Sequence, residues 1–241
     1  MNEGAPDRFL GGRIAARQPR DGFRSGLDAV MLAAAVPARP RDSMLELGAG
    51  AGVASLCLAA RVPGCTVAGL EIDPELTALA NENAATNGLD SRVRFVTGDA
   101  CNPPRVLRAS FAHVFANPPF HDPESEASSH PGRARAKRDA GRLAAWLSTG
   151  LKRTASNGTF TLILRADRLG EALAALPATG VTVFPLWPKA DMPAKRILIQ
   201  TRKSARTKLA TLPGLVLHEG DGRYTPEADA ILRGEALLWK A

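Results

Sequence analysis

Short apolar runs alternate with stretches of helical periodicity along most of the chain. Five apolar runs predict strands, at residues 44–47, 66–70, 93–96, 111–116 and 159–164. Apolar side chains at helical spacing predict helices between them, at residues 53–62, 74–87 and 139–152. Strands that alternate with helices of this length are typical of a parallel sheet with helices on both faces.

The last third of the chain has a different pattern. Apolar runs at 181–186 and 195–201 predict two more strands, and their connection is too short for a crossover helix. We therefore expect a hairpin that gives the sheet an antiparallel edge. Before the first strand, Ser25 and Asp28 resemble a capping box for a helix that Pro37 closes.

Length and composition fit one folded domain. The chain has 241 residues, of which 45% are hydrophobic and 23% are charged. The pattern predicts an α/β fold with a seven-stranded, mostly parallel sheet. We expect a single domain, with an N-terminal segment at 1–42, a core at 43–201 and a C-terminal extension at 202–241.

Charge and the reactive side chains narrow the possible classes of protein. The net charge of +7 favours a polyanionic partner such as nucleic acid, although a basic surplus also serves solubility. The three cysteines form no Cys-x-x-Cys pair and the four histidines are scattered, so no metal site is expected. No signal peptide or membrane-length apolar run is visible, so we expect a cytoplasmic protein without a membrane contact.

A glycine-rich turn, Glu-Leu-Gly-Ala-Gly-Ala-Gly at 46–52, follows the first strand. Glycines at a strand-to-helix turn let a ligand approach the backbone closely, although a tight turn after a buried strand is the simpler alternative. The spacing is not the Gly-x-Gly-x-x-Gly of dinucleotide sites but the form associated with S-adenosylmethionine (SAM). The candidate cofactor residues in this turn are Glu46, Gly48, Ala49, Gly50 and Gly52.

Further cofactor candidates follow the next two strands. Glu71, with Ile72 beside it, stands where a carboxylate can accept hydrogen bonds from ribose hydroxyls, whereas Asp73 is expected to cap the next helix. After the third strand, the Asp99 carboxylate can accept from an adenine amino group while the backbone N–H at Ala100 donates to a ring nitrogen. Since the carboxyl ends of parallel strands meet at one edge, these elements together predict a SAM site.

The fourth strand ends in Asn117, Pro118, Pro119 and Phe120. The Asn117 side-chain oxygen and the Pro118 carbonyl can accept the two N–H groups of an amino group that is conjugated to a ring or carbonyl. Such contacts favour the positive charge that grows on this nitrogen as a methyl group arrives. The prolines remove N–H donors, and Phe120 offers a face for stacking. We expect methyl transfer to a planar nitrogen without a metal or a covalent nucleophile.

Upstream of the first strand, Arg24 and Asp28 lie close to a glycine at residue 22. They could close over the methionyl group of SAM, or they could belong to a helix cap and a solvated loop. The residues alone leave both readings open.

Nearly the whole chain, from about 17 to 233, resembles the bacterial tRNA1(Val) (adenine-37-N6)-methyltransferase family. The resemblance is carried by Asp-Gly-Phe-Arg at 21–24, the glycine-rich turn, Gly-Leu-Glu-Ile-Asp at 69–73, Asn-Pro-Pro-Phe at 117–120 and Tyr-Thr-Pro-Glu at 224–227. It implies a Rossmann-like class I SAM-dependent fold and N6 methylation of an adenine beside the tRNA anticodon. The family's motif positions fall on Glu46, Gly48, Gly50, Glu71, Asp99 and Asn117 to Phe120.

Two basic clusters are candidates for tRNA binding. One follows the Asn-Pro-Pro-Phe motif, where it could hold an RNA backbone, and the other follows a strand and could extend the phosphate track. Either cluster could instead be a solvated loop. The first contains Arg133, Arg135, Lys137 and Arg138, and the second contains Arg202 and Lys203.

Other reactions remain open at this stage. A protein glutamine N5-methyltransferase uses the same chemistry on an amide, but such enzymes carry a substantial helical domain before the core, and fewer than about 45 residues precede the first strand here. An N-methyltransferase acting on another RNA or a small molecule is a further alternative. An O-methyltransferase would need a general base or metal, which the motif does not offer. A non-catalytic SAM- or RNA-binding module is the alternative of a different class. The sequence does not indicate an oligomeric state.

Overall fold

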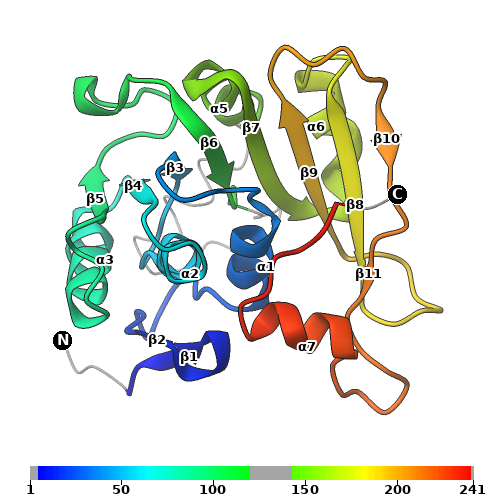
Figure 1. The fold of residues 1–241 in the computed structure, drawn as a ribbon, viewed down its shortest axis with the longest axis horizontal. Coiled ribbons are helices and arrows are strands. Elements are labelled where there is room, and N and C mark those ends of the chain that lie inside the picture. The colour runs from blue at the N-terminus through cyan, green and yellow to red at the C-terminus, as the bar shows by residue number, and fades with distance from the viewer. Residues whose placement is uncertain (1–4, 120–142, 240–241) are drawn as a thin grey trace.

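The computed structural model describes residues 5–119 and 143–239. Its centre is a nine-stranded sheet in the order β10-β8-β9-β7-β6-β3-β4-β5, with β11 paired to β8 (Figure 1). Five neighbouring strands run parallel: β3 Ser43–Leu47, β4 Thr66–Glu71, β5 Val93–Thr97, β6 Phe111–Ala116 and β7 Thr154–Arg165. These are the five strands that the apolar runs predicted.

The hairpin predicted in the last third is present. Strand β9, Arg196–Arg202, lies between β7 and β8, Val181–Trp187, and is antiparallel to both. Two short strands that no apolar run indicated, β10 Ala210–Thr211 and β11 Leu215–Val216, pair with β8 in parallel. The seven longer strands therefore match the prediction, and two short ones extend the sheet beyond the hairpin.

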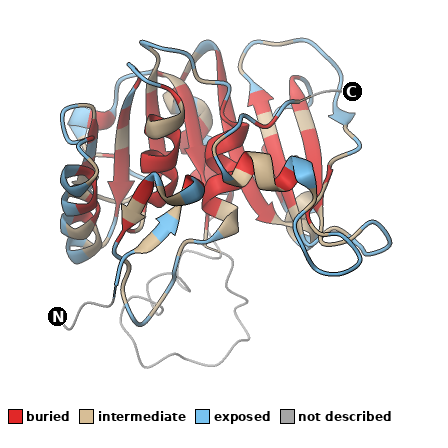
Figure 2. Cartoon of the chain, turned by 60° about the horizontal axis from the view of Figure 1, so that its bottom comes forward, coloured by how far each residue is buried: buried red, intermediate tan, exposed pale blue. Residues whose placement is uncertain are grey.

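Helices cover both faces of the sheet, and the strands are buried between them (Figure 2). One face packs against α1 Leu27–Ala35, α2 Val53–Arg61, α3 Pro74–Thr86 and α7 Pro226–Leu232. The other packs against α5 Leu143–Arg153 and α6 Leu169–Ala175. Residues 139–142 of the predicted third helix lie outside the described residues.

Alternation along β3 decides which face each side chain meets. Met44 packs in the α1–α2 cluster, whereas Leu45 and Leu47 pack in the α5 cluster. Because successive side chains of a strand point to opposite faces, Glu46 is directed toward α2. A carboxylate in this buried position needs hydrogen-bond donors from that helix.

The ends of α3 follow the predicted signals. Asp73 is the N-cap, and its side chain accepts a hydrogen bond from the Glu75 N–H at 2.9 Å. At the other end, Gly88 has a φ of +65°, and the Leu89 N–H reaches the Ala84 carbonyl at 2.8 Å. This pattern is a Schellman motif, which glycine favours because the left-handed conformation costs it little.

The start of α1 differs from the prediction. Its N-cap is Gly26, without a side-chain cap, so the capping box of Ser25 and Asp28 is wrong. The Ser25 N–H donates instead to the Gln18 side-chain oxygen at 2.6 Å, and the Asp28 carboxylate pairs with Arg196 at 2.8 Å. Ser25 and Asp28 thus bind Gln18 and Arg196 instead of the helix start, and the three-residue spacing of Ser25 and Asp28 could not indicate these partners.

A short antiparallel hairpin precedes α1 and was not predicted. It consists of β1 Asp7–Phe9 and β2 Ile14–Ala16, and the side chains of Ile14 and Ala16 are buried against the face that carries α2. The chain then runs from β2 into the segment of residues 17–26.

The parallel strands all end at one edge of the sheet, which we call the carboxyl edge. Register pairs place the ends of β3, β4, β6 and β7 there, together with the start of β9 and the ends of β8 and β11. In open α/β sheets, ligands bind outside this edge. In Figure 1 the β6 arrow points down toward this edge, and the loops after β8 and β11 emerge at the bottom of the view.

Candidate functional site

The glycine-rich turn after β3 adopts a conformation that suits glycine. Gly48, Gly50 and Gly52 have φ angles of +70°, +56° and +85°. The N–H groups of Gly48 and Ala49 both donate to the Leu70 carbonyl, at 2.7 and 2.9 Å. The turn is therefore fixed to the end of β4, and its backbone is held in one geometry before any ligand arrives.

Two aromatic rings pack against this turn and leave one position open. A Cβ at Gly48 would lie 2.4 Å from the Trp146 ring, and a Cβ at Gly52 would lie 2.6 Å from the Phe95 ring. A Cβ at Gly50 would meet nothing within 4 Å. Gly50 is therefore the position at which a ligand can approach the backbone of the turn.

Glu71 connects the turn to the loop after β4. Its two carboxylate oxygens accept from the Gly50 N–H at 2.8 Å and the Asp73 N–H at 2.9 Å. Burial raises its pKa, and the backbone donors oppose that rise. Each oxygen has a second lone pair, so the carboxylate can still accept from ligand hydroxyls. The neighbouring Ile72 is 39% exposed and offers an apolar surface beside it.

The loop after β5 is tied to the same place. The Gly98 N–H donates to the Glu71 carbonyl at 2.8 Å, and one Asp99 oxygen accepts from the Cys101 N–H at 2.8 Å. Ala100 is buried beside it. The structure thus brings together Glu71, Asp99 and the glycine-rich turn, as the order of the strands predicted.

Asn117 follows β6 at the same edge. Its side-chain oxygen is buried and has no hydrogen-bond partner in the described part of the chain. A buried acceptor without a partner costs free energy, which a donor from a ligand would recover. Pro118 is buried, and the Pro119 carbonyl accepts from the Arg168 guanidinium at 3.4 Å. Phe120 lies outside the described residues.

Sequence reasoning did not assign Trp146 or Arg168 to this site. The Trp146 ring packs under Gly48, and its indole N–H is also buried without a partner among the described residues. Arg168 pairs with Glu171 at 2.7 Å, so a carboxylate balances the charge that it brings to the motif. Only the spacing of Trp146 in its helix was visible in the sequence, and that spacing indicated a core position.

Glu46 lies beneath the turn, in the α2 side of the core. One carboxylate oxygen accepts from both the backbone N–H and the hydroxyl of Ser55 in the first turn of α2. Burial raises its pKa to about 8. These contacts explain how Glu46 holds the start of α2 behind the turn, and its expected contact with the cofactor stays a prediction.

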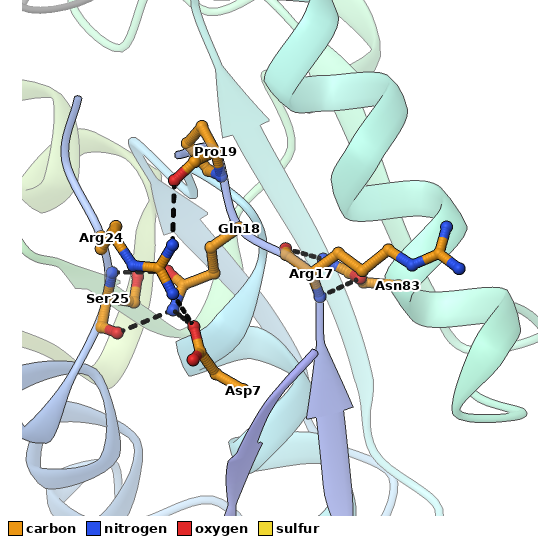
Figure 3. A network of polar contacts seen from close by, with 7 residues as sticks. All are labelled: Asp7, Arg17, Gln18, Pro19, Arg24, Ser25 and Asn83. Carbon is orange, nitrogen blue, oxygen red and sulfur yellow. Dashed lines mark hydrogen bonds and ion pairs between the residues drawn. The ribbon is translucent and has the colours of Figure 1, made fainter. Parts of the chain in front are cut away.

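The segment of residues 17–26 is held by a polar network (Figure 3). The Gln18 side chain donates to Asp7 at 2.8 Å and to the Ser25 carbonyl at 3.0 Å, and accepts from the Ser25 N–H. Arg24 pairs with Asp7 and donates to the Pro19 carbonyl at 3.2 Å. The segment therefore has a defined shape although it contains no helix or strand.

Asn83 of α3 attaches this segment to the glycine-rich turn. Its side chain pairs with the N–H and carbonyl of Arg17, at 2.8 and 2.9 Å, and also donates to the Ala51 carbonyl at 3.0 Å. Asn87, one helical turn later, pairs in the same way with Ala15 at 3.0 and 2.7 Å. The two amides thus hold the backbone of β2 and of Arg17, the residue that follows it.

The far end of the segment reaches the start of β9. Asp28 of α1 pairs there with Arg196, which is opposite Arg165 in the sheet. Asp28 therefore lies at the carboxyl edge, whereas Arg24, four residues earlier, is held by Asp7. Their expected contact with a methionyl group stays a prediction.

The structure does not bring the second basic cluster to this edge. Strand β9 is antiparallel, so Arg202 at its end is opposite Thr159 of β7, toward the amino ends of the parallel strands. The Lys203 ammonium donates to the carbonyls of Leu151 and Thr154, at 2.9 and 2.6 Å, at the end of α5. Arg202 and Lys203 therefore lie away from the carboxyl edge, and their expected contact with tRNA stays a prediction. Residues of the first cluster, Arg133, Arg135, Lys137 and Arg138, lie outside the described residues.

The residues at the carboxyl edge fit the expected cofactor. Gly50 leaves room for close approach, Glu71 and Asp99 offer acceptors, and Asn117 has a buried oxygen that no described residue contacts by a hydrogen bond. Among the described residues, no cluster of three or more metal-binding side chains occurs and no helix is long and apolar enough to cross a membrane. Cys57, Cys65 and Cys101 form no disulfide in the described part of the chain.

The known proteins that this chain resembles are methyltransferases. Residues 26–132 match the family described as the methyltransferase small domain. A tRNA1(Val) (adenine(37)-N6)-methyltransferase of Porphyromonas gingivalis is 28% identical, over 92% of this chain and 91% of that protein. Another with the same name, from Dickeya chrysanthemi, is 25% identical over 89% of this chain and 88% of that protein.

Solved structures show the same fold. A predicted O-methyltransferase of Agrobacterium tumefaciens superposes with a TM-score of 0.74, at 25% identity, over 88% of this chain and 98% of that chain. TrmN of Thermus thermophilus superposes with a TM-score of 0.53, at 21% identity, over 73% of this chain and 48% of that chain. The chain is therefore a SAM-dependent methyltransferase with the class I fold, and its predicted resemblance to the bacterial tRNA1(Val) (adenine-37-N6)-methyltransferase family is confirmed.

Proposed function

We propose that this protein transfers a methyl group from SAM to the N6 amino group of an adenine in tRNA, beside the anticodon. The observation that carries the proposal is the Asn117 oxygen at the carboxyl edge, next to two prolines. This oxygen is buried and has no hydrogen-bond partner among the described residues. The names of the full-length relatives, tRNA1(Val) (adenine(37)-N6)-methyltransferase, supply the substrate class. A tRNA substrate also accounts for the net charge of +7, and a cytoplasmic location follows from it.

Asn117 and Pro118 act on the amino group. Its lone pair is delocalised into the ring, so the free base is a poor nucleophile. The Asn117 oxygen accepts one N–H and the Pro118 carbonyl the other, which stabilises the pyramidal nitrogen and the positive charge it gains. When bound, SAM supplies an activated methyl group. Water can take the surplus proton afterwards, because the product ammonium is acidic.

The cofactor residues align the reacting groups. Glu71 would accept from the ribose hydroxyls of SAM and Asp99 from its adenine amino group, and the open backbone at Gly50 would admit the methionyl part. Holding donor and acceptor in line supplies much of the rate enhancement, because the reaction needs no covalent intermediate. Arg168 helps to fix the motif through the Pro119 carbonyl, and Glu171 neutralises its charge.

Two other reactions fit less well. The glutamine N5 reaction would use the same acceptors, but the relatives that cover most of this chain are named for tRNA. O-methylation, suggested by the name of the Agrobacterium structure, needs a base to take the hydroxyl proton. Asn117 and the prolines contain no such base.

The test is methylation of unmodified tRNA1(Val) transcript by purified protein with SAM, followed by nucleoside mass spectrometry. We expect N6-methyladenosine with wild-type protein and none with a transcript that has guanine at position 37. Asn117→Ala should lower kcat by about 10²-fold or more while SAM still binds, since it removes a contact made in the transition state. Product from the guanine-37 transcript would contradict the assigned position. Methylated release factor without methylated RNA would favour the glutamine reaction.

A further inference from the structure

Two stacked rings stand on the surface after β11. The rings of His218 and Tyr224 have centroids 4.8 Å apart and an interplanar angle of 27°. Tyr224 is 42% exposed, and Phe23 is the other Phe, Tyr or Trp side chain of comparable exposure among the described residues. His218 therefore covers one part of the tyrosine ring, and the rest remains accessible.

The loop that carries the rings is well ordered by its own hydrogen bonds. His218 donates its N–H to the Pro188 carbonyl at 3.1 Å, and its Nδ1 lies 3.1 Å from the same oxygen. The Thr225 hydroxyl donates to the Val216 carbonyl at 2.7 Å, and Thr225 then caps α7. Lys189 reaches the Gly220 carbonyl at 2.9 Å. A ring held this way loses little entropy on binding a ligand.

This loop stands on the carboxyl edge, as the methyl-transfer motif does. Strand β11 pairs with the end of β8, which is level with the end of β7 through β9. From β6 to β11 there are four inter-strand steps of about 4.8 Å, so the rings lie about 20 Å from Asn117 along the edge. A target adenine at Asn117 could not reach them, but another nucleotide of the same RNA could.

The surroundings favour a base over a phosphate or a protein surface. The neighbours of Tyr224 in the loop are Glu219, Gly220, Asp221, Gly222 and Arg223. Arg223 pairs with Asp221, and the other charges at the loop are Lys189 and Glu219, so positive and negative side chains balance and no surplus positive charge is left for a phosphate. A protein interface would need a wider apolar patch around the ring. A single aromatic face among polar side chains suits one planar base.

We propose that Tyr224, backed by His218, is a stacking site for an unpaired base of the substrate RNA other than the base that is methylated. The proposal rests on the proposed tRNA substrate. Because stacking involves no ion pair, the contact should contribute to RNA affinity without changing its dependence on salt.

The test compares Tyr224→Ala, Tyr224→Leu and Tyr224→Phe with wild type. Leu209→Ala is the matched control, since Leu209 is 45% exposed but lies beside β10, which pairs with the amino-terminal half of β8. The dissociation constant of labelled tRNA1(Val) is measured by anisotropy over a salt series. SAM affinity and thermal melting are measured on the same samples, and methylation kinetics follow.

Loss of one stack should weaken tRNA binding about tenfold in Tyr224→Ala and Tyr224→Leu, by the same factor at every salt concentration. Tyr224→Phe and Leu209→Ala should stay within twofold of wild type. The KM for tRNA should rise, with kcat and SAM affinity unchanged. Tyr224→Leu keeps an apolar side chain that can pack on the His218 ring but has no aromatic face. This variant therefore separates the loss of base stacking from a loss of loop stability.

Several results would overturn the proposal. If wild type and Tyr224→Ala methylate and bind tRNA alike, the stacking site is wrong while the proposed function stands. If wild type neither binds nor methylates RNA, the proposed function fails and this site fails with it. Unchanged RNA affinity with an altered oligomeric state would assign the ring to a protein contact instead.

Discussion

At the residue scale, Glu46 couples the site to pH. Its carboxyl pKa is about 8 in the folded protein against an ordinary value of 4.5, because burial disfavours the charged form. Between these values the folded state binds more protons than the unfolded state. The free energy of unfolding should therefore fall as pH rises from about 4.5 to about 8, and level off above.

The matched variant is Glu46→Gln, which keeps an oxygen for Ser55 and cannot ionise. Denaturant titrations of both proteins from pH 5 to pH 9 should show a steeper decline for wild type, with the difference growing up to about pH 8. A smaller slope remains in both from Glu71, whose pKa burial also raises. Parallel curves for the two proteins would mean that Glu46 is charged throughout.

Glycine substitutions should separate stability from cofactor binding. Gly48→Ala puts a Cβ 2.4 Å from the buried Trp146 ring at a φ of +70°, so we expect a loss of about 2–4 kcal/mol in unfolding free energy. Gly50→Ala has similar backbone strain at +56° without a clash, so it should lose only about 1 kcal/mol. The alanine Cβ in Gly50→Ala occupies the open position, so the loss of SAM affinity relative to the loss of unfolding free energy should be larger in Gly50→Ala than in Gly48→Ala.

Calorimetric titration with SAM and thermal melting of both variants measure these two quantities. Equal losses of unfolding free energy in the two variants would contradict the prediction.

At the element scale, Asn83 and Asn87 allow a test of the N-terminal segment. Both hold the backbone that leads into it, but only Asn83 also reaches Ala51 in the glycine-rich turn. Each alanine variant should lose about 1–3 kcal/mol in stability, because buried backbone groups lose their partners. Asn83→Ala should also weaken SAM binding several-fold, while Asn87→Ala should not. Equal SAM affinities in the two variants would show that the segment does not act through the turn.

Elements with strong periodicity were predictable from the sequence, and short ones were not. The runs that became β3 to β9 are long enough to show alternation or continuous burial. The strands β1, β2, β10 and β11 have two or three residues each and exist because of their pairing partners. Helix α6, with seven residues, is too short to show a period.

Helix α7 was within reach of prediction. Thr225 caps it, Pro226 is its first residue and Gly234 follows its end with a φ of +110°. These are the ordinary start and stop signals of a helix. The Tyr-Thr-Pro-Glu segment predicted only the family resemblance, although its Thr and Pro also indicate the start of a helix.

At the scale of the whole molecule, the candidate site follows from chain direction. Parallel strands deliver Glu71, Asp99 and Asn117 to one edge, and the order of motifs in the sequence predicted this. The same rule places Arg202 toward the other edge, because β9 runs antiparallel. The predicted hairpin itself reverses the chain direction, so the basic residues after β9 lie toward the opposite edge. Contacts such as Arg168 with Pro119 depend on side-chain packing that no spacing indicates.

Charge should govern how the whole molecule meets tRNA. With a net charge of +7, tRNA affinity should fall steeply with salt, with a logarithmic slope of about −0.7 to −0.9 per phosphate contacted, while SAM affinity should change little. Alanine at Arg133, Arg135, Lys137 and Arg138 together should make that slope shallower by about 2–4 if these side chains bind phosphates.

Lys203→Met is the control for that slope, because it also removes a positive charge. Its ammonium donates to two carbonyls at the end of α5, so the variant should lose about 1–2 kcal/mol in stability and keep the wild-type slope. Anisotropy titrations of tRNA1(Val) measure both variants over about a sixfold range in salt concentration, from about 50 to about 300 mM. The opposite result would be a shallower salt slope in Lys203→Met and a wild-type slope in the variant with four alanines. It would mean that the RNA binds at the edge opposite the carboxyl edge, and the site around Asn117 would then need a different acceptor.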